Sequence, residues 1–354
     1  MTIKTLMIQF AVLLLAAVGS GAWAAETINR KREKNLSGEV SSVTKTEVQV
    51  KVKTPKEDTI KVPANDIASI EWSGEPPECK VARSDENGGR FQKAIDGYQK
   101  ALQSNKATNA FLKTDLEFGI ARAMAKLALT DPAKIDEAVK KLDEFRAKNG
   151  DFYRFYDSLN FLGQLHAARK DSVKARTAFE ALGRAPWKDY QMTARIALGR
   201  LALADNKIDE AAAEYDAVIG MQADGSVEES LRQEAVLGKA RVLIGQKNYD
   251  EALKLLDEVI AKAPADDAKV NAEAFLRQGD CLREQGNDKD ALLAYLVVDV
   301  LFSSERAYHA EALYRLSSLW DKVGNKGRAE EARDRLKSDY ESSDWTKQLR
   351  APAA

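Results

Sequence analysis

Small residues recur along the chain at a nearly constant interval, and this repeat limits the possible folds more than any other feature. The recurring positions are Ala94, Ala138, Ala175, Ala211, Ala252, Ala291 and Ala329, so the intervals are 44, 37, 36, 41, 39 and 38 residues. Four residues after each alanine stands a large side chain in six units, namely Tyr98, Leu142, Phe179, Tyr215, Leu256 and Tyr295, with Arg333 as the exception. This period is typical of arrays in which each unit buries its apolar face against its neighbours.

The segment 234–264 indicates what one unit contains. Apolar residues recur at helical spacing from Ala235 to Ile244, Asn248 interrupts them, and the pattern resumes at Tyr249 until Pro264 ends it. This predicts two helices folded back on each other. A chain of 354 residues is too long for one compact core, and a repeat array avoids that limit. We therefore expect a mainly α protein built as an α-α superhelical solenoid.

The units resemble the tetratricopeptide repeat. The first unit carries the pattern most fully, as Gly89-Arg90-Phe91-x-x-Ala94-x-x-x-Tyr98-x-x-Ala101-Leu102, and Gly199 and Gly279 precede the same pattern in later units. The resemblance covers about residues 78–340 and implies about seven hairpins in a right-handed superhelix over 76–342, followed by a tail at 343–354. The intervals exceed the family's 34 residues, so longer helices or loops, or a related helical-hairpin repeat, are expected. The final unit also looks like repeats of bacterial envelope-assembly proteins.

Residues 1–24 have the pattern of a secretory signal peptide. Lys4 precedes an apolar run from Leu6 to Val18, and Ala22-Trp23-Ala24 forms a small-x-small cleavage pattern. We expect export to the periplasm or another extracytoplasmic space, with cleavage after Ala24. The alternative is an uncleaved membrane anchor, although the run is shorter than the ~20 residues of a spanning helix.

The next two segments are predicted to be a charged linker at 25–35 and a small β-domain at 36–75. Alternation such as Val48-x-Val50-x-Val52, with turn signals between the runs, predicts four short strands. We expect a meander curled into a small open barrel that is similar to SH3-like or Sm-like barrels. A structural cap or docking module is the preferred interpretation.

The chain lacks the usual signals of catalysis or metal binding. It has no HExxH, GxSxG, P-loop or CxxC motif, and its two histidines, His166 and His309, fall in different repeats. Cys79 and Cys281 are also far apart in the array, which argues against a disulfide. A net charge of −1 gives little support to nucleic-acid binding. We therefore predict no enzyme activity, catalytic residue, cofactor or metal.

The inner face of the superhelix is the expected partner-binding surface, because the first helix of each unit lines it in solenoids of this type. Registering the units on their glycines and small residues selects Ile196, Arg200, Leu203, Leu237, Arg241, Ile244 and Arg283. This mixed apolar and basic face suits an acidic, extended or helical segment. Reversing the charges of Arg200 and Arg241 is expected to abolish capture without changing melting.

The sequence thus predicts an exported, non-enzymatic scaffold for a protein or peptide partner of the cell envelope. Two alternatives stay open. One is an envelope enzyme or carbohydrate-binding protein acting on peptidoglycan or polysaccharide, and the other is a self-assembling structural protein. Acidic pairs such as Glu228-Glu229 are expected to face water, and Trp187 and Trp345 are weaker candidates for partner contacts.

Overall fold

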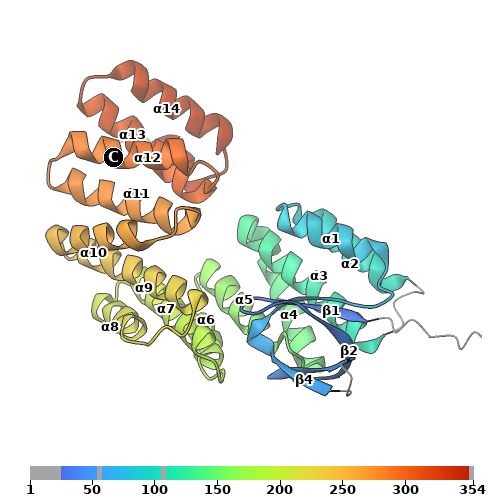
Figure 1. Cartoon of the computed structure of the whole chain (residues 1–354). Coiled ribbons are helices and arrows are strands. Elements are labelled where there is room, and N and C mark those ends of the chain that lie inside the picture. Colours follow the sequence, from blue (N-terminus) through green and yellow to red (C-terminus); the bar gives the residue numbers. More distant parts are fainter. Residues whose placement is uncertain (1–24, 54–57, 105–108, 351–354) are drawn as a thin grey trace, which may run out of the picture.

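The computed structural model describes residues 25–53, 58–104 and 109–350, so the predicted signal peptide lies outside the described residues. Helices dominate and form seven antiparallel hairpins, each of a first and a second helix (Figure 1). The pairs are α1 (Pro77–Asn87) with α2 (Phe91–Gln103), α3 (Ala110–Thr130) with α4 (Ile135–Lys148), α5 (Phe155–Ala168) with α6 (Ser172–Leu182), α7 (Lys188–Ala204) with α8 (Ile208–Ile219), α9 (Ser226–Gly245) with α10 (Tyr249–Lys262), α11 (Ala268–Glu284) with α12 (Asp288–Leu301), and α13 (Arg306–Lys322) with α14 (Lys326–Asp339). The predicted solenoid of seven units is confirmed.

The periodic small residues lie where the two helices of a unit meet. All seven alanines are completely buried, and the large residue four positions later is buried in the six units that have one. The four aromatic ones, Tyr98, Phe179, Tyr215 and Tyr295, pack against glycines of first helices. A Cβ atom added to Gly163 would lie 2.3 Å from the Phe179 ring, and one added to Gly279 would lie 2.5 Å from the Tyr295 ring. The small residues are therefore required by close helix approach.

The turn between the two helices of a unit has the same backbone conformation in six units and a different one in the second. In six of the seven units, one turn residue takes a positive φ: Gly89, Lys170, Asn206, Lys247, Gly286 and Gly324. The second unit instead connects its helices through a 3-10 turn, η2 (Pro132–Lys134), after a first helix of 21 residues. The expectation of longer helices or loops is confirmed in this unit.

The N-terminal sheet has five antiparallel strands rather than the four predicted. They are β1 (Glu26–Arg30), β2 (Leu36–Val43), β3 (Glu47–Val52), β4 (Asp58–Pro63) and β5 (Ile67–Glu71), in the spatial order β4-β3-β2-β1-β5. The prediction of a charged linker over 25–35 is wrong for β1, which is hydrogen-bonded on both sides. The pattern missed it because a single apolar residue, Ile28, turns toward the core.

The order of the strands requires the sheet to curl. Strands β4 and β5 are at opposite edges, yet only the 3-10 turn η1 (Ala64–Asp66) joins them. Five flat strands would hold those edges ~19 Å apart, and three residues reach only ~10 Å. A curled sheet was predicted, but its last strand pairs with β1 instead of continuing the meander.

The C-terminal segment is partly helical rather than a simple tail. Helix α15 (Asp344–Arg350) packs on α13 and α14, and its Thr346 is fully buried. The Trp345 ring lies 5.2 Å from the Tyr314 ring, and Trp187 lies 5.7 Å from Tyr156. Both tryptophans therefore contribute to intramolecular packing.

The cysteines and histidines occupy the interior. Cys79 and Cys281 are both fully buried, and both are free thiols. His309 contacts Asp299 and Tyr340 at 2.7 and 2.5 Å, and His166 is also buried. Among the described residues, no helix is long and apolar enough to cross a membrane.

Candidate peptide-binding groove

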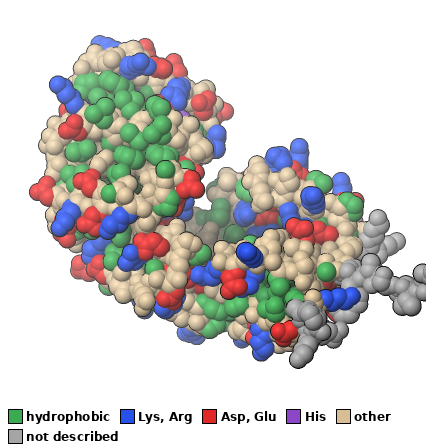
Figure 2. Space-filling model, viewed as in Figure 1, with side chains coloured by type: hydrophobic (Ala, Val, Ile, Leu, Met, Phe, Trp, Pro, Cys, Tyr) green, Lys and Arg blue, Asp and Glu red, His purple; other side chains and the backbone are tan. Residues whose placement is uncertain are grey.

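A continuous groove runs along the inner face of the superhelix, where the first helices of successive units face the hollow seen in Figure 2. It consists of three adjoining cavities of about 760, 490 and 420 Å³. The two larger cavities share Asn160, Thr193 and Leu231, and the two smaller ones share Lys31 and Asp157. We call this surface the inner groove, and it extends from α1 to Lys269 of α11.

Polar, uncharged side chains line the middle of the inner groove. Asn160 and Gln164 are one turn apart on α5, and the Gln164 amide donates a hydrogen bond to the Asn160 carbonyl oxygen at 3.1 Å. Thr193 of α7 lies at the junction of the two larger cavities. Amide and hydroxyl groups of this kind can bond the backbone of an extended chain.

Arginine–glutamate pairs connect the first helices of successive units. Arg241 of α9 pairs with Glu273 of α11 at 2.9 Å, and Arg277 of α11 pairs with Glu311 of α13 at 2.6 Å. Arg200 of α7 pairs in the same way with Glu234 of α9, which also contacts Lys269 at 3.5 Å. We call these pairs the charge ladder.

The charge ladder neutralises the basic face that the sequence predicted. Burial tends to raise the pKa of the Glu234 carboxyl, but the charges of Arg200 and Lys269 outweigh this and lower its pKa. Glu234 therefore stays ionised at neutral pH, and Arg200 has a partner within the protein.

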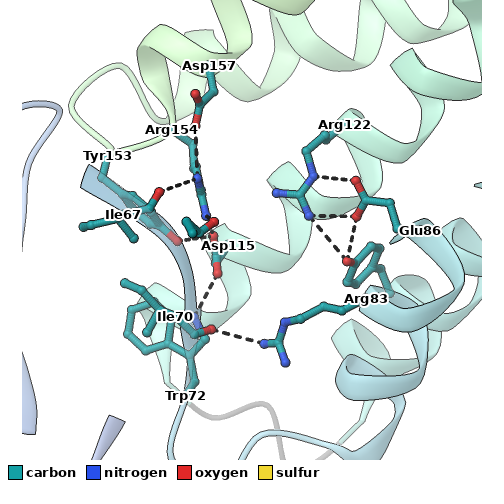
Figure 3. A network of polar contacts seen from close by, with 12 residues as sticks. Ile67, Ile70, Trp72, Arg83, Glu86, Asp115, Arg122, Tyr153, Arg154 and Asp157 are labelled. Carbon is teal, nitrogen blue, oxygen red and sulfur yellow. Dashed lines mark hydrogen bonds and ion pairs between the residues drawn. The ribbon is translucent and has the colours of Figure 1, made fainter. Parts of the chain in front are cut away.

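The first cavity of the groove, beside α1 and α3, is built around Glu86 (Figure 3). The Glu86 carboxylate accepts hydrogen bonds from Arg122 at 2.7 and 2.8 Å and from the Tyr98 hydroxyl at 2.8 Å, and it also pairs with Lys126. Burial alone would raise the pKa of Glu86, but Arg122 and Lys126 outweigh it and lower the pKa to about 2. The carboxylate is therefore held charged.

Edge strand β5 closes the same cavity, and arginines from the helices bond its outward carbonyls (Figure 3). Arg154 donates to the carbonyls of Ile67 and Ala68 at 3.4 and 2.9 Å, and Arg83 donates to that of Ile70 at 3.2 Å. Asp115 of α3 accepts from the Trp72 indole and the Tyr153 hydroxyl. This edge is thus blocked against further strand pairing.

Arg32 ties the sheet to the middle of the solenoid. Its guanidinium contacts Asp189 at the start of α7 at 2.9 Å and Glu228 at the start of α9 at 2.8 Å. Asn65 of η1 also donates to Asp189 at 3.1 Å. Glu228 was expected to face water, but it is 3% exposed, because the sheet covers it.

Comparison with known proteins identifies the repeat. The model of the tetratricopeptide repeat matches residues 121–189, 196–267 and 237–305, which together make up half of the chain. The chain belongs to the tetratricopeptide repeat family. Among curated proteins, none matches the sequence.

Solved structures share the tetratricopeptide fold with this chain at low sequence identity. A tetratricopeptide repeat protein from Parabacteroides merdae has a TM-score of 0.54 at 15% identity, with 77% of this chain and 95% of that chain covered. A Rap protein in complex with competence and sporulation factor has a TM-score of 0.55 at 16% identity, with coverages of 77% and 79%. The apo form of RapI has a TM-score of 0.51 at 13% identity, with the same coverages. At these identities the likeness concerns the fold.

The inner groove contains only some of the residues that the sequence selected. Ile196 and Leu237 are 2% and 1% exposed, so they are interhelix core residues and not contact residues, although Ile196 borders the largest cavity. Leu203 and Ile244 are partly buried and pack against neighbouring core clusters, and Arg283 pairs with Glu284 on its own helix. The selected residues lie on first helices, but large apolar side chains at the position of Ile196 and Leu237 pack against the adjacent unit.

The Arg241–Glu273 ion pair argues against the expectation that reversing Arg200 and Arg241 would leave melting unchanged. A negative side chain in place of Arg241 would face Glu273, whose side chain is 6% exposed. Burying two like charges is costly, so that pair of changes would test stability as well as binding.

Sequence reasoning missed Asn160, Gln164, Thr193 and the N-terminal network. Polar residues on a helix carry no signal of their own until the neighbouring units place them around one hollow. The described residues include no group of three His, Cys, Asp or Glu side chains that could hold a metal ion.

Proposed function

We propose that this protein is a scaffold or adaptor that holds an extended segment of another protein in the inner groove. The continuity of the three cavities across the first helices carries this proposal. Packed helix axes are ~8–10 Å apart, so the span from α5 to α11 matches roughly seven to nine extended residues. The Rap protein, solved with a bound factor, supplies a precedent for ligand binding by this fold.

Recognition in this groove rests on hydrogen bonding more than on net charge. Asn160, Gln164 and Thr193 offer groups for peptide backbone, and the charge ladder pairs Arg200 with Glu234. The first cavity is the more basic end, because five bases line it against three acids: Lys31, Arg83, Arg122, Lys126 and Arg154 against Glu86, Asp115 and Asp157. An acidic residue of the bound segment would therefore be oriented toward the N-terminal end.

The groove carboxylates argue for binding without catalysis. A glycoside-cleaving enzyme needs one carboxyl that keeps its proton near neutral pH and a second that faces it. The pKa of Asp157 is lowered, since the charge of Arg154 outweighs burial, and Asp189 accepts hydrogen bonds from Asn65 and Arg32. These groups are committed to structural pairs, so the enzyme alternative is not the preferred one.

We further infer an extracytoplasmic location from the signal-like pattern of residues 1–24. Strand β1 begins at Glu26, two residues after the expected cleavage position, which is compatible with a mature chain that starts at Ala25. N-terminal sequencing of the protein recovered from the cell envelope would test this. A mature chain that begins at Met1 would contradict cleavage.

Blocking the groove should remove partner capture. Ala197 lines the largest cavity from α7, so Ala197→Trp would fill the path of an extended segment. Ala213 is exposed on α8, and Ala213→Trp is the matched control. We expect the first variant to lose captured protein in crosslinking and pull-down from intact envelopes, and the second to retain it.

Equal capture by the two variants would refute the groove as the binding site. Ala197 is partly buried and packs against the core cluster of Phe179 and Leu201, whereas Ala213 is exposed, so circular dichroism of both variants must match that of the unchanged chain before capture is compared. Recovery of cleaved glycan fragments instead of protein would favour the enzyme alternative.

A further inference from the structure

The loop after β1 brings a lysine from the N-terminal sheet into the inner groove. Lys31 lines the cavities of about 420 and 490 Å³, and we call the latter, which adjoins the two others, the middle cavity. The Lys31 backbone N–H donates to the Asp66 carbonyl at 2.7 Å. The next residue, Arg32, is held by Asp189 and Glu228. The backbone that carries this lysine is therefore fixed against both the sheet and the helices.

Lys31 differs from the other bases that line these two cavities, because they have carboxylate partners and it has none. Within the described residues, its ammonium forms no hydrogen bond or ion pair, and it lies 6.0 Å from the centre of the Tyr190 ring. The other bases each contact an acid at 2.6 to 3.1 Å, namely Arg83 with Glu75, Arg122 and Lys126 with Glu86, and Arg154 with Asp157. Lys31 is thus the lining base that is left to meet a ligand.

The acids of the middle cavity already have partners within the protein. Asp157 contacts Arg154 at 3.1 Å and accepts a hydrogen bond from the Tyr190 hydroxyl at 2.6 Å. Asp189 contacts Arg32 at 2.9 Å. Because neither carboxylate depends on Lys31, a further anion that enters the cavity finds this ammonium available as its counter-ion.

Two hydroxyl groups line the same cavity from α9. Ser226 begins this helix and Ser230 lies one turn later, both are exposed, and neither side chain forms a hydrogen bond with another described residue. The acids of the first turn, Glu228 and Glu229, have arginine partners. One ammonium, two free hydroxyls and the positive end of a helix dipole together suit a single carboxylate.

We propose that Lys31 binds an acidic side chain of the segment held in the inner groove, and that Ser226 and Ser230 complete the site. This inference rests on the proposed function and names the chemistry that the groove selects. The middle cavity adjoins another cavity on each side, so a bound segment passes through it. The carboxylate therefore belongs to an aspartate or glutamate side chain and not to a chain end. Since the selecting base comes from the sheet, the N-terminal β-domain takes part in recognition.

Selection of nonapeptides from a random phage-displayed library, with the full chain as bait, tests this proposal. Peptides enriched on the unchanged chain should carry aspartate or glutamate at one position. Those enriched on Lys31→Glu should carry lysine or arginine there, because the charge of the site is reversed. The best peptide of the first selection should bind Lys31→Glu roughly tenfold more weakly in fluorescence anisotropy, since a repulsive pair replaces an attractive one. Exchanging its acid for lysine should restore binding to that variant.

Lys34→Glu is the matched control, because Lys34 is exposed in the same loop and lines neither of the two cavities. This variant should keep the preference for an acid. Lys31→Gln avoids a new negative charge near Asp157, and it should lose the acidic preference without gaining a basic one. A second library, displayed with free C-termini, separates the two sources of a carboxylate. Enrichment of a terminal carboxylate in place of an acidic side chain overturns the assignment.

The selection also separates this inference from the proposed function. Peptides that enrich and lose binding to Ala197→Trp, but whose charge does not follow residue 31, would leave the groove standing and overturn the role of Lys31. If the unchanged chain enriches no peptide, or if its peptides bind Ala197→Trp equally well, the inner groove is not the binding site and both proposals are wrong.

Discussion

Glycines of the first helices fix how closely the units can pack. Gly238 and Gly245 belong to the same helix, but a Cβ on Gly238 would lie 2.3 Å from the Tyr215 ring, whereas one on Gly245 meets nothing within 4 Å. Gly238→Ala should lower the free energy of unfolding by about 1–3 kcal/mol through overpacking. Gly245→Ala should be neutral or raise it by up to ~1 kcal/mol, since alanine favours helix. Urea unfolding followed by circular dichroism measures both, and equal midpoints would contradict the close approach.

Also at the residue scale, Glu86 should make stability depend on pH. Its folded pKa of about 2 lies below the ordinary 4.5, so its contribution is fully present above pH 4.5 and is lost as pH falls toward 2. Glu86→Gln should cost about 2–3 kcal/mol of unfolding free energy at pH 7, and the difference from the unchanged chain should shrink from pH 5 to pH 3. Glu258→Gln, on an exposed helix face, should show neither effect. A difference that stays constant with pH would mean that the charge of Glu86 is not what stabilises the fold.

At the scale of elements, β1 is an integral strand, and Arg32, two residues after its end, anchors distant helices. Arg32→Met keeps the length of the side chain but leaves Asp189 and Glu228 without their guanidinium partner. We expect a loss of roughly 2 kcal/mol, with faster hydrogen exchange in β1 and in the first turns of α7 and α9. Lys34→Met, at an exposed position of the same segment, should change neither. Unaltered exchange at α7 and α9 would show that the sheet and those helices are not coupled through Arg32.

Across the whole molecule, an element could be predicted from the sequence where its local pattern of apolar residues matches the way it packs. Buried alanines recur with the period of the units, so the seven hairpins could be predicted from Ala94 to Ala329. Strand β1 could not be predicted, because Ile28 is its only apolar residue on the core face. Glu26 and Arg30 form polar contacts instead, with the Val40 backbone N–H and with Asp66. The residues selected from the sequence lie on first helices, as does much of the lining of the inner groove, but the burial of Ile196 depends on the neighbouring unit. That contact is set by how the superhelix closes and cannot be read from one helix.

The N-terminal sheet contacts each of the first five units. The contacts are made by one residue per unit, namely Arg83, Asp115, Arg154, Asp189 and Glu228. Because each unit of a solenoid contacts only its neighbours, we expect a load between the two ends to separate the units with the fewest additional contacts first. Here the sheet braces five units along one side, whereas within the described residues no hydrogen bond joins the sheet to the sixth or seventh unit. A pull between the two ends would therefore be taken up at the C-terminal units first. A partner held in the inner groove would lie on the units that the sheet braces. Deformation under load would then fall on the sixth and seventh units.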